Sequence, residues 1–470
     1  MIRSNALLCI ILIVIFLIGT IKRFKGDYRT NYLFISMFII AAPFDILWPV
    51  LELTHKAVVR GRESLVVLGA FGSVININVG FLSAIILILS GRFKLKKELF
   101  YLRNNWWFYS LIGLAVISYF NPYNTFPAAI FPMLFTVTQF WALFILIESN
   151  FDRQTIVKGV YYGLAILSIL MLVLTIAYPI LDLKWVASFF YGKQTYIKSI
   201  RREGYPSTVG IFWHPNTLGF FSVIPVSFFA CCYLNHYKKN IMNIMFIMMS
   251  LFTCFFTFSR VSFLSVFIAL ITVVVLQQKK TRFVTKKVVV GILCFIACFV
   301  LLFWYLSNYQ NLLLFKDVDA MLNIREEHWR LGYEIWNQAK ILGVGLNTHV
   351  YYLAHNDLYY SGATNAFTVN VFIHNIHLII LAELGLIGIV LWIYLLFIKF
   401  KKIVDLKTNY SKEDNILKMT FLAILVGLIV AGFFDWSPIA QANFSLVLFF
   451  GFFSTQFFSQ SINSKDEVRI

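Results

Sequence analysis

Arginines and one histidine stand at the ends of long apolar runs, where their chemistry would operate at a membrane surface. Arg260 follows Phe258-Ser259 inside the apolar stretch 241–276, and His374 stands near the start of the apolar run 371–398. An arginine in apolar sequence is costly unless it reaches water or binds an anion, so Arg260 is a functional candidate. A neutral imidazole near pH 7 can accept a proton from a hydroxyl nucleophile, which an arginine cannot do.

Three further arginines could act with these two residues. Arg201 and Arg202 precede His214-Pro215-Asn216, and Arg325 opens a segment rich in charged and aromatic residues. Guanidinium groups suit phosphate and pyrophosphate oxygens through forked, bidentate hydrogen bonds. Several arginines and a histidine on one membrane face therefore fit group transfer from a lipid carrier with a phosphate leaving group.

Each candidate also has a simpler interpretation. Arg260 could be a helix-end cation that extends to water, and Arg201 and Arg202 could be solvated loop charges. Arg325 could pair with an adjacent glutamate. His374 could be a structural histidine near a helix start, although His377, one turn further on, suits that role as well.

Cofactor chemistry is not expected. His214, His349 and His355 have no ligand-like spacing to a carboxylate, and the sequence carries no metal motif. It also has no glycine-rich nucleotide loop followed by lysine. The six cysteines all lie in apolar runs and are predicted to be buried small side chains.

The composition predicts a membrane protein with many spans. Of the 470 residues 60% are hydrophobic and 13% charged, and the mean hydropathy is +0.77. The net charge of +18 would suggest nucleic acid as the partner of a soluble domain. Here the cations gather in short loops such as 92–97, 279–287 and 399–402, which is typical of cytoplasmic loops, so nucleic acid is not expected.

About twelve or thirteen runs are long enough to span a bilayer, which predicts an all-α polytopic protein. They are 5–21, 32–53, 65–90, 106–121, 126–147, 156–180, 215–234, 241–258, 261–277, 287–306, 371–398, 416–434 and 440–458. The stretch 241–276 is too long for one span and must fold back at Ser259-Arg260. The first apolar run lacks a cleavage site and is interpreted as a retained helix.

The basic loops fix an orientation from residue 91 onward. Loops 91–105, 148–155, 235–240, 278–287 and 399–415 are assigned to the cytoplasm. Alternation then sends 121–125, 181–214, 259–260, 307–370 and 435–439 to the outer side, so the candidate site residues share one face. The side of the N-terminus stays open, because it depends on whether there are twelve or thirteen spans.

The outer interval 307–370, between the tenth and eleventh spans, is too long for a simple connector. Within it Trp329, Tyr333 and Trp336 recur at helical spacing, with Glu326 and Glu334 facing away from them. This predicts an amphipathic helix that lies on the membrane or caps the bundle and ends at Gly343.

The same positions resemble the O-antigen ligase and polysaccharide polymerase superfamily of bacterial envelopes. The resemblance spans about residues 200–400, and its motifs lie in a consistent order. They are Arg201-x-x-Gly204 before Pro215-Asn216, Phe258-Ser259-Arg260, Arg325, Gly343-x-Gly345, His374-Asn375 and Glu383-x-Gly385-Leu386-Ile387-Gly388. The family pattern places an arginine nearer to Pro215-Asn216 than this chain does, which leaves open whether Arg201 or Arg202 corresponds to it.

The resemblance implies a metal-independent glycosyltransferase without cofactors in the bacterial cytoplasmic membrane, with an extracytoplasmic active site. It implies an undecaprenyl-pyrophosphate-linked glycan donor and a glycan or lipid-glycan acceptor, with a flippase and a chain-length regulator as possible partners. Arg260, Arg201, Arg202 and Arg325 would bind the donor pyrophosphate, and His374 with Arg260 would be catalytic. The chain would divide into N-terminal spans 1–200, the family-like core 201–400 and C-terminal spans 401–470.

The alternative function is a lipid-linked glycan flippase or polysaccharide exporter. A transporter should place charges near the middle of broken helices and show internal repeats. Here the spans carry few charges and the polar clusters gather on one side, which favours the enzyme. The sequence does not decide between polymerisation and ligation, because acceptor choice depends on the shape of the outer groove.

Overall fold

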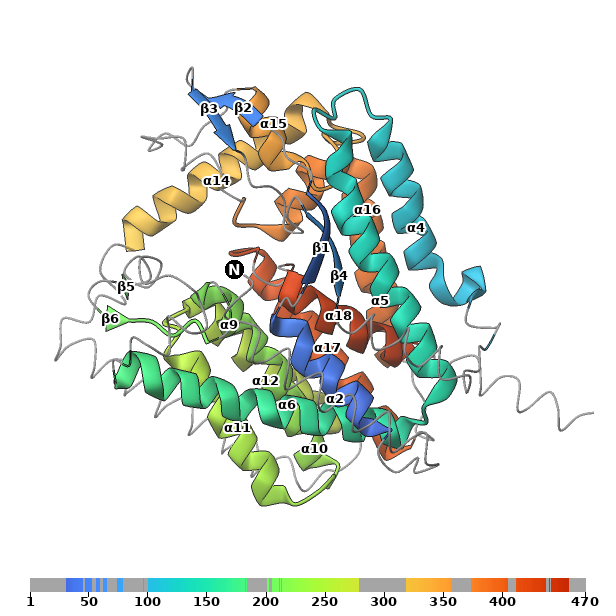
Figure 1. Ribbon diagram of the computed structural model, residues 1–470, viewed down its shortest axis with the longest axis vertical. Helices are drawn as coiled ribbons and strands as arrows, with labels where there is room; N and C mark the ends of the chain where they lie inside the picture. The colour runs from blue at the N-terminus through green and yellow to red at the C-terminus, as the bar shows by residue number, and fades with distance from the viewer. Residues whose placement is uncertain are drawn as a thin grey trace, which may run out of the picture.

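The computed structural model of the chain is dominated by helices (Figure 1). It describes residues 31–44, 47–52, 56–59, 62–65, 74–78, 96, 100–181, 183, 201–202, 205–210, 212, 214–278, 318–356, 373–404, 411–436, 439 and 441–455. Within these ranges the predicted all-α polytopic class is confirmed. Six helical segments are long and apolar enough to cross a membrane.

The helices follow one another along the whole described chain. They are α2 (Tyr32–Ala41), α4 (Leu102–Tyr119), α5 (Ile130–Asn150), α6 (Arg153–Thr175), α9 (Pro215–Phe221), α10 (Val223–Leu234), α11 (Asn240–Phe255), α12 (Arg260–Gln278), α14 (Val318–Gln338), α15 (His349–His355), α16 (Ile376–Val404), α17 (Lys412–Gly432) and α18 (Gln441–Thr455). Short 3-10 or π turns are η2 (Ala42–Phe44), η4 (Pro127–Ala129) and η5 (Ile176–Ile180). The predicted spans 5–21 and 287–306 lie outside the described residues.

A bundle of α2, α5, α6, α9, α10, α17 and α18 contains the main core. Its tightest contact is between α2 and α6, where two glycines spaced by four residues face isoleucines. A Cβ built on Gly159 would lie 2.5 Å from Cβ of Ile35, and one on Gly163 would lie 2.7 Å from Cβ of Ile39. Small residues at this spacing let two membrane helices approach closely, so larger side chains would force α2 away.

Two predicted spans differ from the structure. Within 32–53 the helix ends at Ala41, and β1 (Leu47–Glu52) pairs antiparallel with β4 (Val74–Asn78), which falls inside the predicted span 65–90. The physical reasons are local. Pro49 lacks the N–H that a helix interior needs, and the alternation of isoleucine and asparagine in β4 has the period of a strand. Two smaller hairpins are formed by β2 (Lys56–Val59) with β3 (Arg62–Leu65), and by β5 (Arg201–Arg202) with β6 (Tyr205–Pro206).

The predicted reversal at Ser259-Arg260 is confirmed. α11 ends at Phe255 and α12 begins at Arg260, so the apolar stretch forms two helices joined by a tight turn. Phe258 in this turn has a positive φ of 51°, a conformation that costs a bulky residue energy and that the surrounding packing must stabilise.

The amphipathic helix predicted after the tenth span is α14, and the face that it buries is not the aromatic row that was expected to pack. Leu331 and Ile335 are buried in a second core with Ile373 and Ile379, near the start of α16. Trp329 and Tyr333 are instead exposed. The helix itself stops at Gln338, and Gly343 lies in the turn beyond it. α14 and α15 lie at the opposite end of the molecule from α10 and α11 (Figure 1).

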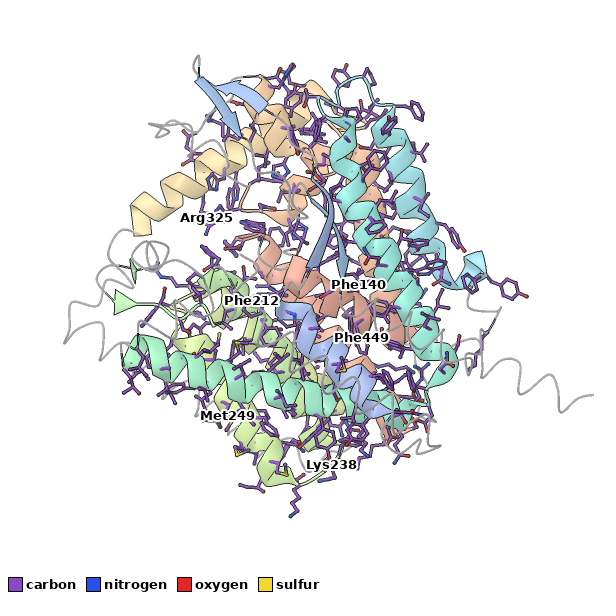
Figure 2. The ribbon with its side chains drawn as sticks, viewed as in Figure 1. Phe140, Phe212, Lys238, Met249, Arg325 and Phe449 are labelled. Carbon is purple, nitrogen blue, oxygen red and sulfur yellow. The ribbon has the colours of Figure 1, made fainter. Side chains whose placement is uncertain are left out.

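The polar loops gather at two ends of the bundle. At one end the Nδ2 of Asn121 donates to Gly343 O at 2.7 Å, and this end also holds Arg325. At the other end Arg153 pairs with Asp414. Figure 2 shows Arg325 and Lys238 far apart along the long axis. Among the described residues, loop 121–125 thus contacts the segment after α14, both predicted to be outer, and Arg153 of loop 148–155 contacts Asp414 of loop 399–415, both predicted to be cytoplasmic.

Candidate functional site

A buried carboxylate, Asp435, is the centre of a polar cluster just beyond the C-terminus of α17. Its side chain is 2% exposed, and Oδ2 lies 3.8 Å from Nη2 of Arg325 and 3.7 Å from Nδ1 of His374. The same oxygen accepts a hydrogen bond from Nδ2 of Asn216. A buried charge is costly unless it is paired, and these three partners offset that cost. The cluster joins α9, α14, α17 and the start of α16.

Asn216 reaches Asp435 because of how α9 begins. The ring Nδ1 of His214 accepts a hydrogen bond from the Asn216 N–H at 3.2 Å and caps the helix. Pro215 occupies the first helical position, where its missing N–H has no cost. A Cβ on Gly219 would lie 2.3 Å from Oγ of Ser262, so α9 packs directly on the first turn of α12.

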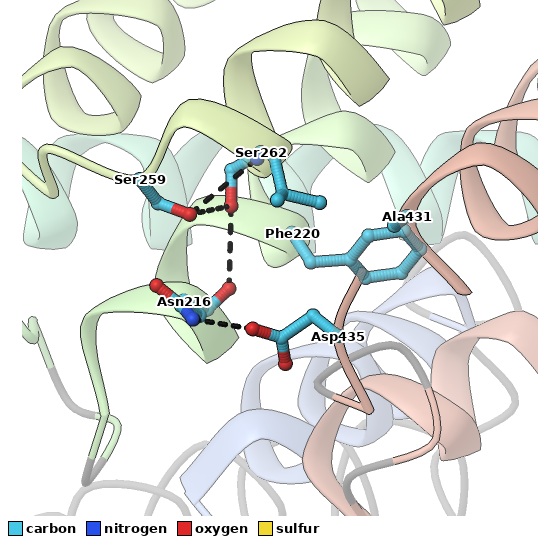
Figure 3. Close-up of a pocket in the computed structure, with 7 residues that line it drawn as sticks. Asn216, Phe220, Ser259, Ser262, Ala431 and Asp435 are labelled. Carbon is cyan, nitrogen blue, oxygen red and sulfur yellow. Dashed lines mark hydrogen bonds between the residues drawn. The ribbon is translucent and has the colours of Figure 1, made fainter. Parts of the chain in front are cut away.

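The start of α12 forms the other wall of a small pocket. The hydroxyls of Ser259 and Ser262 lie 2.8 Å apart, and Ser262 Oγ donates to Asn216 O at 3.5 Å (Figure 3). The lining residues are Asn216, Phe220, Ser259, Val261, Ser262, Ala431 and Asp435. Arg260 stands between two of these residues in sequence and is half-buried. Its backbone therefore lies at the rim of the pocket that Asp435 also lines.

α14 brings Arg325 and His328 to the cluster, one turn apart. Burial lowers the pKa of Arg325, and the charge of Asp435 opposes that shift. Within the described part of the chain, the buried Nη1 of Arg325 has no hydrogen-bond partner. Burial, followed by the effects of His374 and Arg325, lowers the pKa of His328 to about 3. His328 is therefore neutral at physiological pH, and Arg325 has donor capacity for an anion.

His374 stands at the entrance of α16 and stacks on His328. The ring centroids are 4.7 Å apart and the planes are nearly parallel, at 6°. The His374 side chain is 22% exposed, so it lies beside Asp435 and is also open to solvent. Asn375 caps α16, because its Oδ1 accepts a hydrogen bond from the Leu378 N–H at 3.0 Å.

His377 is a packing residue, as the alternative interpretation of the sequence allowed. Its Nδ1 accepts from the indole N–H of Trp392 at 3.2 Å, and its Nε2 lies 3.3 Å from Ile429 O. The ring also contacts the ring of Phe433, with centroids 4.4 Å apart. Nε2 and the ring face thus hold α16 against α17 and its C-terminal turn, while Nδ1 bonds with Trp392 of the same helix.

The cluster has the parts of an acid–base site for an anionic substrate. A carboxylate beside one ring nitrogen orients an imidazole and stabilises its protonated form, which leaves the other nitrogen to take a proton. Arg325 and Arg260 can supply forked donors to phosphate oxygens. Residues on one face of the molecule can therefore take a proton from a hydroxyl and stabilise a leaving phosphate.

The predicted site residues meet this cluster to different degrees. Arg325 and His374 contact Asp435 directly, and Arg260 adjoins the pocket through its neighbours in sequence. The backbone of Arg201 and Arg202 forms β5, and their side chains lie outside the described part of the structure. The position of either arginine relative to Asp435 stays a prediction.

Sequence reasoning missed Asp435 and His328. The signal for Asp435 was available, because it is an acidic residue in a short loop between two apolar runs. His328 was missed because the prediction for this helix rested on its aromatic residues, such as Trp329. Asn216 was noted in a motif, and its amide contact with Asp435 gives that motif a physical role.

His349, predicted to be a loop residue with no ligand-like spacing to a carboxylate, is the first residue of α15 and pairs with Glu383. Its Nδ1 lies 2.6 Å from Oε1 of Glu383, and both side chains are buried. The two residues are 34 positions apart, so no local spacing in the sequence reveals the pair. Glu383 lies more than two helical turns beyond His374 along α16, and the pair is thus a separate feature from the Asp435 cluster.

Part of the chain matches a known protein family. Residues 244–393 match the family model of O-antigen ligase. The matched segment runs from α11 to α16 and includes Arg260, Arg325 and His374. Asn216 and Asp435 come from outside it. No curated protein matches the chain.

Proposed function

We propose that the chain transfers glycan from an undecaprenyl-pyrophosphate carrier, because residues 244–393 match the O-antigen ligase family and six described helices are long and apolar enough to cross a membrane. The acceptor is a hydroxyl of a second glycan or lipid-linked glycan. The reaction takes place at the outer face of the bacterial cytoplasmic membrane. It either polymerises repeat units or ligates a finished chain during synthesis of a cell-surface polysaccharide.

The observation that carries this proposal is the contact of Asp435 with both Arg325 and His374. An arginine and a histidine beside the same oxygen of one buried carboxylate can serve a phosphate leaving group and a hydroxyl nucleophile together. The donor set requires neither a metal ion nor a further cofactor.

In the proposed reaction His374 takes the proton of the acceptor hydroxyl as its oxygen attacks the anomeric carbon of the donor sugar. The bond between that carbon and the pyrophosphate oxygen breaks, and undecaprenyl pyrophosphate leaves with the electron pair. Arg325 and Arg260, with Arg201 or Arg202, stabilise the charge on the pyrophosphate. Asp435 stabilises the imidazolium that forms on His374. A flippase that delivers the donor and a chain-length regulator would be partners of this reaction.

The proposal is tested with purified protein and a lipid-linked repeat unit in detergent or vesicles. We expect longer glycans or an acceptor-linked product, together with release of undecaprenyl pyrophosphate, in buffer that contains a metal chelator. Movement of the lipid-linked unit across the vesicle membrane without any new glycosidic bond would instead identify a flippase.

The outer location makes a separate prediction for labelling. Asn337 and Lys239 are both exposed, and they lie in segments assigned to opposite sides of the membrane. An impermeant thiol reagent should label Asn337→Cys in intact cells and Lys239→Cys only after permeabilisation. The native cysteines described in the structure are buried, and the unsubstituted protein serves as the blank. The reverse pattern would place the Asp435 cluster on the cytoplasmic side.

Replacing Arg260 with lysine separates charge from hydrogen-bond geometry. Lysine keeps the cation but loses the forked donors, so we expect transfer to fall by about ten- to a hundredfold, mainly through the donor. Initial rates at varied donor concentration, at equal protein level, measure the effect. Arg330→Lys is the matched control, because Arg330 is exposed and pairs with Glu327 and Glu334 on α14. A wild-type rate for Arg260→Lys would mean that Arg260 only extends to water.

A further inference from the structure

α16 is broken at Gly385, and the segment after α14 fills the break. Gly385 has a φ of 62°, which interrupts the helical hydrogen bonds on both sides. The N–H groups of Val344 and Gly345 donate to Ala382 O and Glu383 O, each at 2.9 Å. In return the Leu386 N–H donates to Lys340 O at 2.9 Å. The backbone N–H and C=O groups that lose their helical partners at the break thus form hydrogen bonds with one neighbouring segment of the chain.

Two glycines allow this contact. A Cβ on Gly343 would lie 2.4 Å from Glu383 O, and one on Gly385 would lie 2.3 Å from Ile341 O. Both positions also have positive φ, so a side chain at either would be strained as well as in collision. The contact therefore fixes one alignment of the two segments.

The Glu383 carboxylate locks the same alignment from the side. Oε2 accepts a hydrogen bond from the Asn347 N–H at 2.8 Å, and Oε1 accepts one from the His349 N–H at 3.3 Å. Oε1 also lies 2.6 Å from Nδ1 of His349. Glu383 is 6% exposed. A buried carboxylate with three partners in one segment holds that segment far more firmly than a surface ion pair would.

The locked segment directly continues α14, which lies along α16 in one register. His328 stacks on His374, Gly332 contacts Leu378, and Lys340 bonds with Leu386, with the same sequence offset in all three pairs. A slip of one helical turn would move α14 by about 5.4 Å. Such a slip would separate Arg325 from Asp435 and His328 from His374.

We infer that Glu383 is a positioning residue that sets the register of α14 on α16, so that Arg325 and His328 reach Asp435 and His374. Glu383 lies away from the proposed reacting atoms and acts through α14. The inference rests on the proposed function for its effect on rate, but the register itself can be measured without any substrate.

A disulfide across the two helices reports the register. A Cβ on Gly332 would lie 3.3 Å from Cβ of Leu378, close to the roughly 3.8 Å that a disulfide spans. In the Gly332→Cys, Leu378→Cys protein we expect rapid cross-linking by a mild oxidant, and about tenfold slower cross-linking when Glu383→Ala is added. Equal cross-linking rates would overturn the inference.

Activity then decides whether the register is what matters. Under reducing conditions Glu383→Ala with the cysteine pair should transfer glycan about a hundredfold more slowly than the pair alone. Forming the disulfide should restore most of that loss. A cross-linked protein that stays inactive would assign Glu383 another role and overturn the inference. If the unsubstituted protein shows no transfer, the proposed function fails while the cross-linking rates still decide the register.

Glu148→Ala is the matched control. Glu148 is also 6% exposed and is paired with a partner, Arg153, at the other end of the bundle. It should lose a comparable amount of stability and leave the cross-linking rate unchanged. Slower cross-linking in this control would show that general loosening, and not the register, explains the effect of Glu383→Ala.

Discussion

Replacing His374 with alanine is expected to reduce glycan transfer by about a hundred- to ten-thousand-fold, the contribution typical of a general base. The fold should survive, because the ring is partly exposed and Asn375, not His374, caps α16. Binding of the lipid-linked donor should also persist, since the arginines are untouched. Single-turnover rates and donor binding, measured on the same preparation, distinguish a loss of transfer from a loss of donor binding.

His377→Ala is the natural comparison, because this residue is one turn along the same helix and uses both ring nitrogens in packing. It should lower thermal stability and leave the rate per folded molecule much less affected. In cells, the His374→Ala variant should accumulate the carrier-linked oligosaccharide on the outer side of the membrane. Accumulation on the inner side would instead indicate a defect in flipping, and a wild-type rate would make His374 structural.

Replacing Asp435 with asparagine should cost about a hundred- to a thousandfold in rate, since breaking a buried charge pair costs about 3–5 kcal/mol. The substitution keeps the shape of the side chain but removes the charge that faces Arg325 and His374. Asp414→Asn is the control, because Asp414 also faces an arginine, Arg153, at the other end of the bundle.

A double variant tests whether Asp435 acts through His374. If Asp435 orients and stabilises the imidazole, adding Asp435→Asn to His374→Ala should lower the rate little further. If the fold-loss of rate in the double variant equals the product of the two single losses, the two residues act independently. Asp435 would then serve chiefly through Arg325, and donor binding should weaken in the single variant.

The sequence predicted the helical membrane class and the residues that carry charge or a titratable ring, because both depend on local composition. Arg325 and His374 could be selected as arginine and histidine at helix ends without knowing their contacts. The partner of both, Asp435, could not be assigned, because a chain separation of 110 residues between Arg325 and Asp435 leaves no local pattern.

The failures have similar physical origins. The aromatic row of α14 has helical spacing, yet the shape of α16 decides which face is buried, and Gly332 with Leu331 fits it better than Trp329 does. β4 was predicted to be part of a helix because its total hydrophobicity outweighed its alternation. Gly343 and Gly385 belong to two glycine motifs whose order can be read from the sequence. Their contact in the fold could not be predicted, because no local pattern reveals it.

Asn216 and Asp435 stand outside the segment that matches O-antigen ligase, and yet they hold its arginine and histidine. The proposed catalytic cluster around Asp435 therefore cannot be transferred to another protein as one continuous segment. A chimera that exchanges residues 244–393 between two such proteins would pair one parent's Arg325 and His374 with the other parent's carboxylate. Such an exchange would transfer specificity only where the flanking helices of the recipient place a carboxylate at the position of Asp435. The flanking segments must therefore be exchanged together with residues 244–393.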